Sequence, residues 1–230
     1  GLLDPVRLPW DVLEEARLDL GSRGYAGQYE QRPTVDGGNI IKEKWFPKIS
    51  KSDFENLRYK EPIHFFLDTA YSHHGPNDND PSGIIAACRI KNNIYIVHGH
   101  KVYKTFPELI RFLPEYLAAH DYDKVSSTLR IEPKANGISV SQQLKEQTDL
   151  NVAFTPSPTD DKETRLQAVS PKIESGRVIL VEGDWNDEFI DEVCGFPNKP
   201  HDEYVDVLGY AINYLTSDDD DVPDDVSDLF

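Results

Sequence analysis

The chain has 230 residues and a formal net charge of −17. The length suits one sizeable α/β domain, or one domain with attachments. The negative charge excludes a protein that binds nucleic acid simply by being basic, because phosphate affinity comes from neutralising cations. Part of the charge lies in the segment 218–230, which has seven Asp and no Lys or Arg. This composition predicts a disordered acidic tail.

The cysteines and the apolar runs bear on the compartment. Cys88 and Cys194 are the only cysteines, and neither lies in a C-x-x-C motif. We expect both to be buried thiols in a reducing compartment. No apolar run is long enough to span a bilayer, and the N-terminus has no signal-peptide pattern. A soluble intracellular protein is expected, and the absence of any methionine indicates a fragment.

Residues 1–60 differ in pattern from the rest of the chain. A short helix is predicted from Trp10 to about Leu20, where glycines end it. An aromatic, glycine-punctuated passage without sustained periodicity follows over 25–47. Two interpretations remain open: a lead-in that packs on a neighbouring domain, or an N-terminal subdomain of the same globule.

The first strong strand signal is the apolar run 63–67, which ends abruptly in Asp68. The bulky residues of this run favour extended structure. Residues 83–90 and 94–98 then read as a hairpin. The sheet is therefore expected to begin with three antiparallel strands.

The second half of the chain alternates between helical and extended patterns. Helices are predicted over 105–120, 138–148, the segment after Asp160 and Asp161, 184–194 and the segment from His201. Strands are predicted over 124–131 and 151–154, with a hairpin over 173–180. The predicted fold class is α/β: a mixed sheet of three antiparallel strands plus parallel strands, flanked by helices, with an added β-hairpin.

Carboxylates stand where these elements end or begin. Asp68 ends the first strand, Glu132 ends the fourth, and Asp202 and Asp206 lie one helical turn apart in the last helix. The first and fourth strands can be neighbours, because the second and third fold away as an antiparallel meander. Asp206 also interrupts an apolar helix face, where a free carboxylate is costly. We therefore expect these four residues to converge on one site.

Converging carboxylates repel one another unless a cation neutralises them. Oxygen-only ligands favour Mg²⁺ or Mn²⁺ over zinc. Two such ions roughly 4 Å apart can hold a phosphodiester, activate water and stabilise the leaving oxygen. The predicted chemistry is phosphodiester hydrolysis by two metal ions.

Other motifs support less. Residues 78–83 resemble the start of a calcium loop, but Arg89 stands where that loop needs Glu. His73, His74, His98 and His100 lack partners spaced for a zinc site and are interpreted as surface residues. No nucleotide-binding loop or serine-hydrolase elbow is present. Five basic residues of the second half could track a phosphate backbone, although a solvated surface is the simpler interpretation: Lys134, Lys162, Arg165, Lys172 and Arg177.

Three acidic motifs resemble those of a known family, in the same order along the chain. They are Leu67-Asp68-Thr69-Ala70-Tyr71-Ser72, Ile131-Glu132-Pro133-Lys134-Ala135-Asn136-Gly137, and Phe196-Pro197 followed by His201-Asp202-Glu203-Tyr204-Val205-Asp206-Val207-Leu208. The family is the C-terminal nuclease domain of the large terminase subunit of tailed bacteriophages. Residues 27–46 also resemble the passage that joins its ATPase and nuclease domains.

The resemblance implies a ribonuclease H-like fold over 61–216, a lead-in from an upstream ATPase domain over 1–60, and an acidic tail over 217–230. It implies that Asp68 bridges two metal ions, that Glu132 is the second ligand, and that Asp202 and Asp206 supply the third motif. Asp80 matches an auxiliary acid. Glu203 and Val207 depart from the usual Asp and Ala, which leaves open which acid of the third motif touches metal.

The function expected from this resemblance is cutting of concatemeric double-stranded viral DNA during genome packaging. The implied partners are DNA, a portal protein and a small terminase subunit, with no membrane and a monomeric isolated domain in the cytoplasm of the infected bacterial host. Two alternatives stay open. One is a Holliday-junction-resolvase-like nuclease, and the other is a non-catalytic acidic module that binds metal or a partner.

Overall fold

The computed structural model describes residues 6–31, 39–69, 81–157 and 159–217. In this part of the chain, seven strands form one mixed sheet in the order β1-β7-β4-β3-β2-β5-β6. The strands are β1 (Lys48–Ile49), β2 (His64–Asp68), β3 (Ser82–Ile90), β4 (Asn93–Val102), β5 (Leu129–Ile131), β6 (Val152–Phe154) and β7 (Val178–Val181).

Helices connect and flank these strands. They are α1 (Trp10–Gln28), α2 (Lys51–Leu57), α3 (Phe106–Ala119), α4 (Ala135–Gln147), α5 (Lys162–Glu174), α6 (Asn186–Gly195) and α7 (Glu203–Thr216), with a short 3₁₀ helix, η1, at Glu43–Trp45. Among the described residues, no helix is both long and apolar enough to cross a membrane.

The strand directions confirm the predicted fold class. β2, β3 and β4 pair antiparallel, whereas β5 joins β2 in parallel and β6 joins β5 in parallel. On the other side, β7 runs parallel to both β4 and β1. The adjacency of β2 and β5 is the pairing expected for the first and fourth strands.

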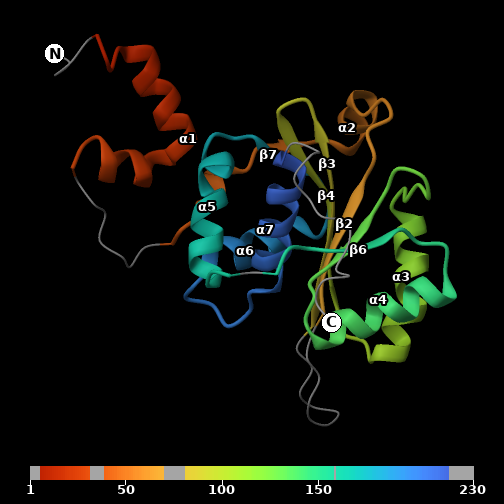
Figure 1. Ribbon diagram of the computed structural model, residues 1–230. Coiled ribbons are helices and arrows are strands. Elements are labelled where there is room, and N and C mark those ends of the chain that lie inside the picture. Colours follow the sequence, from red (N-terminus) through yellow and green to blue (C-terminus); the bar gives the residue numbers. More distant parts are fainter. Residues whose placement is uncertain (1–5, 32–38, 70–80, 158, 218–230) are drawn as a thin grey trace.

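Helices cover both faces of the sheet, as Figure 1 shows, with α5, α6 and α7 on one face and α3 and α4 on the other. Each face has its own core of buried apolar side chains. Because residues alternate along a strand, Phe66 faces one core and Phe65 and Leu67 face the other. The sheet is therefore buried on both sides, as parallel and mixed sheets usually are.

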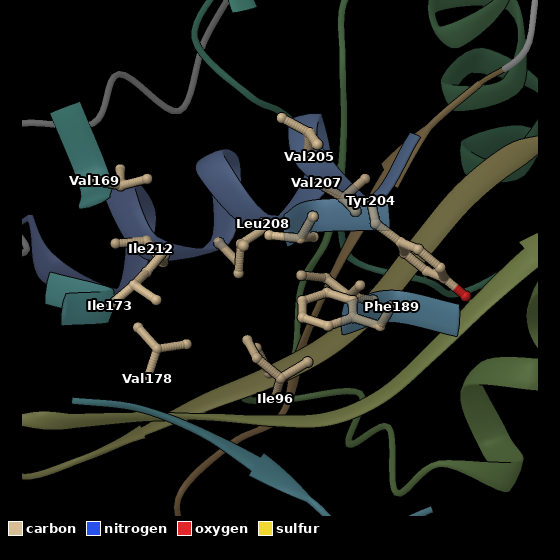
Figure 2. Packing of buried hydrophobic residues seen from close by; sticks show 14 of the residues in the cluster. Ile96, Val169, Ile173, Val178, Phe189, Tyr204, Val205, Val207, Leu208 and Ile212 are labelled. Atoms are coloured by element: carbon tan, nitrogen blue, oxygen red, sulfur yellow. The ribbon is translucent and has the colours of Figure 1, made fainter. Parts of the chain in front are cut away.

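The helix α7 lies on the centre of the sheet and is buried along nearly its whole length. Tyr204, Leu208 and Ile212 recur at helical spacing and are each 0 % exposed. Figure 2 shows Tyr204 and Leu208 on the side of Phe189 of α6, and Ile212 beside Val169 and Ile173 of α5. This packing fixes the position of α7 relative to the strand ends.

The predicted hairpin over 173–180 is wrong. Ile173 belongs to α5, where it continues the buried helical repeat of Leu166 and Val169. Gly176, with φ of 72°, terminates this helix in the left-handed conformation typical of helix C-termini. Val178–Val181 then forms the single strand β7. The Ser-Gly pair is a helix end here, because its upstream neighbours already pack as a helix.

The predicted strand over 124–131 is shorter than expected. Only Leu129–Ile131 is extended, because Asp123 closes a turn by accepting hydrogen bonds from the backbone N–H groups of Val125 and Ser126. The helix α4, in turn, begins three residues before the predicted start. Cys88 is buried as predicted, whereas Cys194 is half-buried.

Part of the N-terminal segment is integrated into the same globule. Ile40, Ile41 and Phe46 lie in the core beneath α5, α6 and α7, and β1 extends the sheet. Earlier in the chain, α1 kinks at Gly21, and Ser22 donates its backbone N–H to Glu174 of α5 at 2.7 Å. The segment 39–57 is thus an edge of the sheet; the link to an upstream ATPase domain stays a prediction.

Candidate active site

Asp68 and Glu132 lie side by side because their strands are parallel neighbours. Asp68 is the last residue of β2, and Glu132 directly follows β5. Alternation along the strands puts Asp68 on the same side as Phe66, and Glu132 on the same side as Arg130. Phe66 lies in the core that α7 covers. Both carboxylates therefore belong to the α7 face of the sheet.

The helix α7 brings further carboxylates to this edge. Asp206 lies near its N-terminus and is 2 % exposed, while Asp202 is the residue before its first turn and is half-buried. Lys162 Nζ of α5 lies 2.6 Å from Asp202 Oδ1 and 2.7 Å from Asp206 Oδ2. Arg165 of α5 also ion-pairs with Asp206. Two cations of one helix thus hold two acids of another.

Lys134 plays the same part for the strand carboxylates. Its Nζ lies 2.6 Å from Glu132 Oε2 and 4.0 Å from Asp68 Oδ1. Burial, followed by the adjacent Glu132 carboxylate, raises the pKa of Asp68 from 3.8 to about 8, with a smaller contribution from Asp206. Although burial opposes ionisation of Glu132, the Asp68 carboxyl and the Lys134 ammonium lower its pKa. Protonation of the metal-free pair is therefore favoured on Asp68 over Glu132.

The acids fit a divalent cation in chemistry. Both Oε atoms of Glu132 and the Oδ2 atom of Asp206 are buried, with lysine ion pairs but no well-formed hydrogen bond from a described residue. Hard oxygen donors with free lone pairs suit a divalent ion. Among the described residues, however, no group of three or more acids, His or Cys is already arranged around a common point. In this conformation the ammonium groups of Lys134 and Lys162 neutralise the acids instead.

A comparison with protein families identifies the chain. Residues 67–215 match the family described as the Terminase RNaseH-like domain. The chain belongs to this family. The match spans the three acidic motifs and all elements from the end of β2 to α7. No curated protein sequence matches the chain.

Solved structures of terminases share the fold of this terminase RNaseH-like domain. The large terminase of a thermophilic bacteriophage, in complex with ADP, aligns with a TM-score of 0.64 at 13 % identity over 91 % of this chain and 53 % of that one. The large terminase nuclease of thermophilic phage G20c with bound magnesium gives 0.51 at 14 %, covering 68 % and 83 %. The human cytomegalovirus terminase nuclease domain, soaked with Mn and bound to an inhibitor, gives 0.53 at 14 %, covering 78 % and 96 %.

The family match confirms the resemblance drawn from the acidic motifs and the ribonuclease H-like class, and the solved structures share the fold. The chain spans about half the length of the large terminase that was solved with ADP. The G20c nuclease is also known with bound zinc. Family membership gives the terminase RNaseH-like domain a nuclease role in DNA packaging.

The loop that carries Glu132 depends on Gly137. A Cβ atom added at Gly137 would lie 2.0 Å from the backbone O of Glu132, so α4 can start beside the site only with glycine there. Gly137→Ala should shift Glu132, lower metal-dependent cleavage and destabilise the domain by about 1–3 kcal/mol, the usual cost of overpacking. Urea unfolding and plasmid nicking measure both effects.

Gly209 supplies the matched control, because among the described residues a Cβ added there meets no atom within 4 Å, apart from its chain neighbours and the backbone of its own helix. In α7, Gly209→Ala should stabilise the domain by about 0.5–1 kcal/mol through helix propensity, with cleavage unchanged. Equal effects of the two substitutions would contradict the role assigned to Gly137.

The remaining predicted acids lie apart from this cluster or outside the described residues. Glu203 points toward Lys101 of β4, with Glu203 Oε2 at 3.5 Å from Lys101 Nζ, and its other oxygen lies 3.5 Å from His201 Nδ1. Asp80 falls in the segment 70–80, outside the described residues, as do His73, His74 and the start of the rejected calcium loop.

The five basic residues predicted to track DNA divide into two groups. Lys134, Lys162 and Arg165 all contact the carboxylates described above. Lys172 and Arg177 lie beside Arg89, at the opposite end of the sheet, where burial, then Arg89 and Arg177, lowers the pKa of Lys172. The structure thus does not gather the five into one continuous stripe.

His98 and His100, both predicted to be surface residues, differ in burial. His100 is exposed, as expected of a surface residue. His98 is half-buried, its Nδ1 lies 2.6 Å from the Tyr116 hydroxyl, and its ring centroid lies 4.1 Å from that of His120. The surface interpretation of His98 is therefore wrong, because α3 packs over this part of β4.

Sequence reasoning missed two residues beside the acids. Tyr210 of α7 is buried, and its pKa is raised by burial, then by Glu132 and Asp206. Arg130 of β5 lies two residues before Glu132 on the same face and is 5 % exposed. The one available signal was spacing, because Tyr210 follows Asp206 by one helical turn and Arg130 precedes Glu132 by one strand repeat.

Proposed function

We propose that this chain is a divalent-metal-dependent endonuclease that cuts concatemeric double-stranded viral DNA during genome packaging. The observation that carries the proposal is that Asp68 and Glu132 lie side by side at the ends of parallel strands, and that Asp206 of α7 lies on the same face of the sheet. Lysine and arginine side chains stand in as counter-ions of these acids. Such a cluster is costly to ionise without cations and is typical of sites that bind divalent metal. Because the chain belongs to a terminase family, we propose DNA as the substrate.

In this proposal Asp68, Glu132 and Asp206 hold two ions, Mg²⁺ or Mn²⁺, with Asp202 at the rim. The ions would polarise the scissile phosphate and lower the pKa of an attacking water. Asp68, whose pKa is raised by burial, then by Glu132 and Asp206, would lose its proton when metal binds. Lys134 and Lys162 would then release their acids and lie near the phosphate oxygens.

The partners follow from the family and belong to the proposal. A portal protein and a small terminase subunit would present the DNA, and an ATPase domain would move it. Tight binding of DNA by the isolated chain is not expected, because its formal charge is −17.

The test is cleavage of supercoiled plasmid DNA by the wild-type chain with Mg²⁺, Mn²⁺ or EDTA. We expect nicking and linearisation with Mn²⁺ or Mg²⁺ and none with EDTA. Competition between a four-way junction and a linear duplex separates the alternatives: equal cleavage supports the packaging nuclease, whereas strong junction preference supports the resolvase. Absence of cleavage with every divalent ion would refute an enzymatic role.

A further inference from the structure

A cavity of about 360 Å³ opens next to the carboxylates, between β5, α5, α7 and the segment that follows β6. Its lining includes Arg130, Thr155, Arg165, Tyr210 and Tyr214. Arg165 also ion-pairs with Asp206, so the cavity directly adjoins the carboxylates. The volume lies within the range of roughly 300–1,000 Å³ found for small-ligand pockets.

Arg130 is a buried cation that ion-pairs with no acid in the part of the chain that the structure describes. It is 5 % exposed, donates from Nη1 to the backbone O of Phe154 at 3.2 Å, and lies 3.8 Å from the ring centroid of Tyr214. Among the described residues it has no carboxylate partner, and its Nε–H has no hydrogen-bond acceptor. Burying a charge in this way costs free energy unless an anion compensates it.

Two hydroxyl groups of the same cavity are also poorly satisfied. The Thr155 hydroxyl is buried and hydrogen-bonds to no described residue, and the buried Tyr210 hydroxyl faces Glu132 without a well-formed hydrogen bond. Native proteins satisfy most buried polar groups, so unsatisfied groups that share one cavity indicate a missing partner. Together with the guanidinium groups of Arg130 and Arg165, these hydroxyls make the lining rich in hydrogen-bond donors. Such a lining suits an anion with several acceptor oxygens.

The side chains that line the cavity favour a nucleotide over a bare anion. Arginine pairs recognise phosphate by paired hydrogen bonds. The ring of Tyr214 is held at 5.1 Å from His64 and 5.8 Å from Phe66, which fixes it as a flat apolar wall. Aromatic walls of this kind receive bases or sugars of a single strand.

We propose that this cavity binds one nucleotide of the DNA strand beside the scissile phosphate. The guanidinium of Arg130 and the Thr155 hydroxyl bind its phosphate, and Tyr214 contacts its sugar or base. The assignment rests on the proposed nuclease function and adds a subsite to it. It also explains why Arg130 is buried there without an acidic partner among the described residues.

The test measures binding of thymidine 5′-monophosphate to the full chain in EDTA, with inorganic phosphate and thymidine as separate probes. Chemical shifts of the Arg130 Nε–H group report occupancy directly, and thermal shifts report affinity. We expect the nucleotide to bind tenfold or more tightly than either probe, and Arg130→Met to weaken binding by about tenfold or more, as expected for lost charged hydrogen bonds. Thr155→Val should weaken it less.

The control is Arg111→Met, which removes the same charge from an exposed position on α3, across the sheet. Arg111→Met should leave binding unchanged. Without ligand, Arg130→Met should keep or raise the melting temperature, because replacing an uncompensated buried charge by an apolar side chain is neutral or stabilising. A lowered melting temperature would mean that Arg130 already has an anionic partner in the free chain, and would overturn the proposal.

Different experimental results would refute the nucleotide subsite and the nuclease function. Asp68→Asn should retain nucleotide binding in EDTA, because Asp68 does not line the cavity. A wild-type chain that cleaves DNA but binds phosphate as tightly as the nucleotide refutes the subsite alone. A chain that binds the nucleotide through Arg130 but cuts no DNA refutes the nuclease alone.

Discussion

Asp68→Asn should reduce Mn²⁺-dependent nicking of supercoiled DNA by about a thousandfold or more, because the proposed function makes Asp68 a metal ligand, and such a ligand would supply several kcal/mol of transition-state stabilisation. Asn keeps the size of the side chain but cannot offer a charged oxygen to a metal ion. The measurement is the initial nicking rate at saturating Mn²⁺. Asp149→Asn makes the same change on an exposed acid and should leave the rate unchanged. Retained nicking by Asp68→Asn would remove this residue from the site.

The same substitution should stabilise the metal-free domain. The pKa of Asp68 is raised to about 8, so the folded state binds a proton that the unfolded state releases near pH 4. The free energy of unfolding of the wild type should therefore fall as the pH rises from about 4 to about 8. Asp68→Asn removes this contribution, flattens that pH dependence and should add about 1–3 kcal/mol at pH 8. Urea unfolding in EDTA across this range tests the sign, and a steeper dependence in the variant would contradict it.

The second large effect concerns a buried ion pair that holds α7. Lys101 of β4 and Glu192 of α6 pair with side chains that are 6 % and 3 % exposed. The other oxygen of Glu192 accepts the backbone N–H of Tyr204 at 2.6 Å, in the first turn of α7. This side chain thus caps the helix that carries Asp206, whose own N-terminal residue, Asp202, makes no side-chain cap.

Glu192→Ala should destabilise the domain by about 3–5 kcal/mol, because it leaves a buried lysine without its main partner. Glu188 and Glu203 lie farther from Lys101, at 3.7 and 3.5 Å, and compensate only in part. The double variant Lys101→Met with Glu192→Leu should recover most of the loss. A double-mutant cycle by urea unfolding measures the coupling.

An exposed ion pair of Asp191, which precedes Glu192 in α6, provides the comparison. Asp191 ion-pairs with Lys199, and their side chains are 70 % and 44 % exposed. Asp191→Ala should therefore cost less than about 1 kcal/mol. Strictly additive losses in the cycle of Lys101 and Glu192 would show that the buried pair does not act as a unit.

Local patterns in the sequence were sufficient for most elements. The apolar run before Asp68, the paired runs on either side of residues 91–92 and the helical repeat of Leu208 and Ile212 each carry their own period, so their structure follows from neighbours along the chain. Strand adjacency followed from the antiparallel meander and the crossover helix. The Ser175-Gly176 pair led to the wrong prediction of a hairpin, because a glycine in the left-handed conformation occurs both in hairpin turns and at helix ends.

What the sequence alone determined is the fold class, because strand ends and helix periods are local properties; the acids that it picked out stay a prediction. What only the tertiary structure decided is which groups surround them. Lys162 and Arg165 lie about 40 residues from Asp206, and Glu192 caps a helix from another element. Packing of α5, α6 and α7 over one face of the sheet creates these contacts. The charge of Arg130 likewise becomes buried, with no carboxylate partner among the described residues, only when that face closes over it.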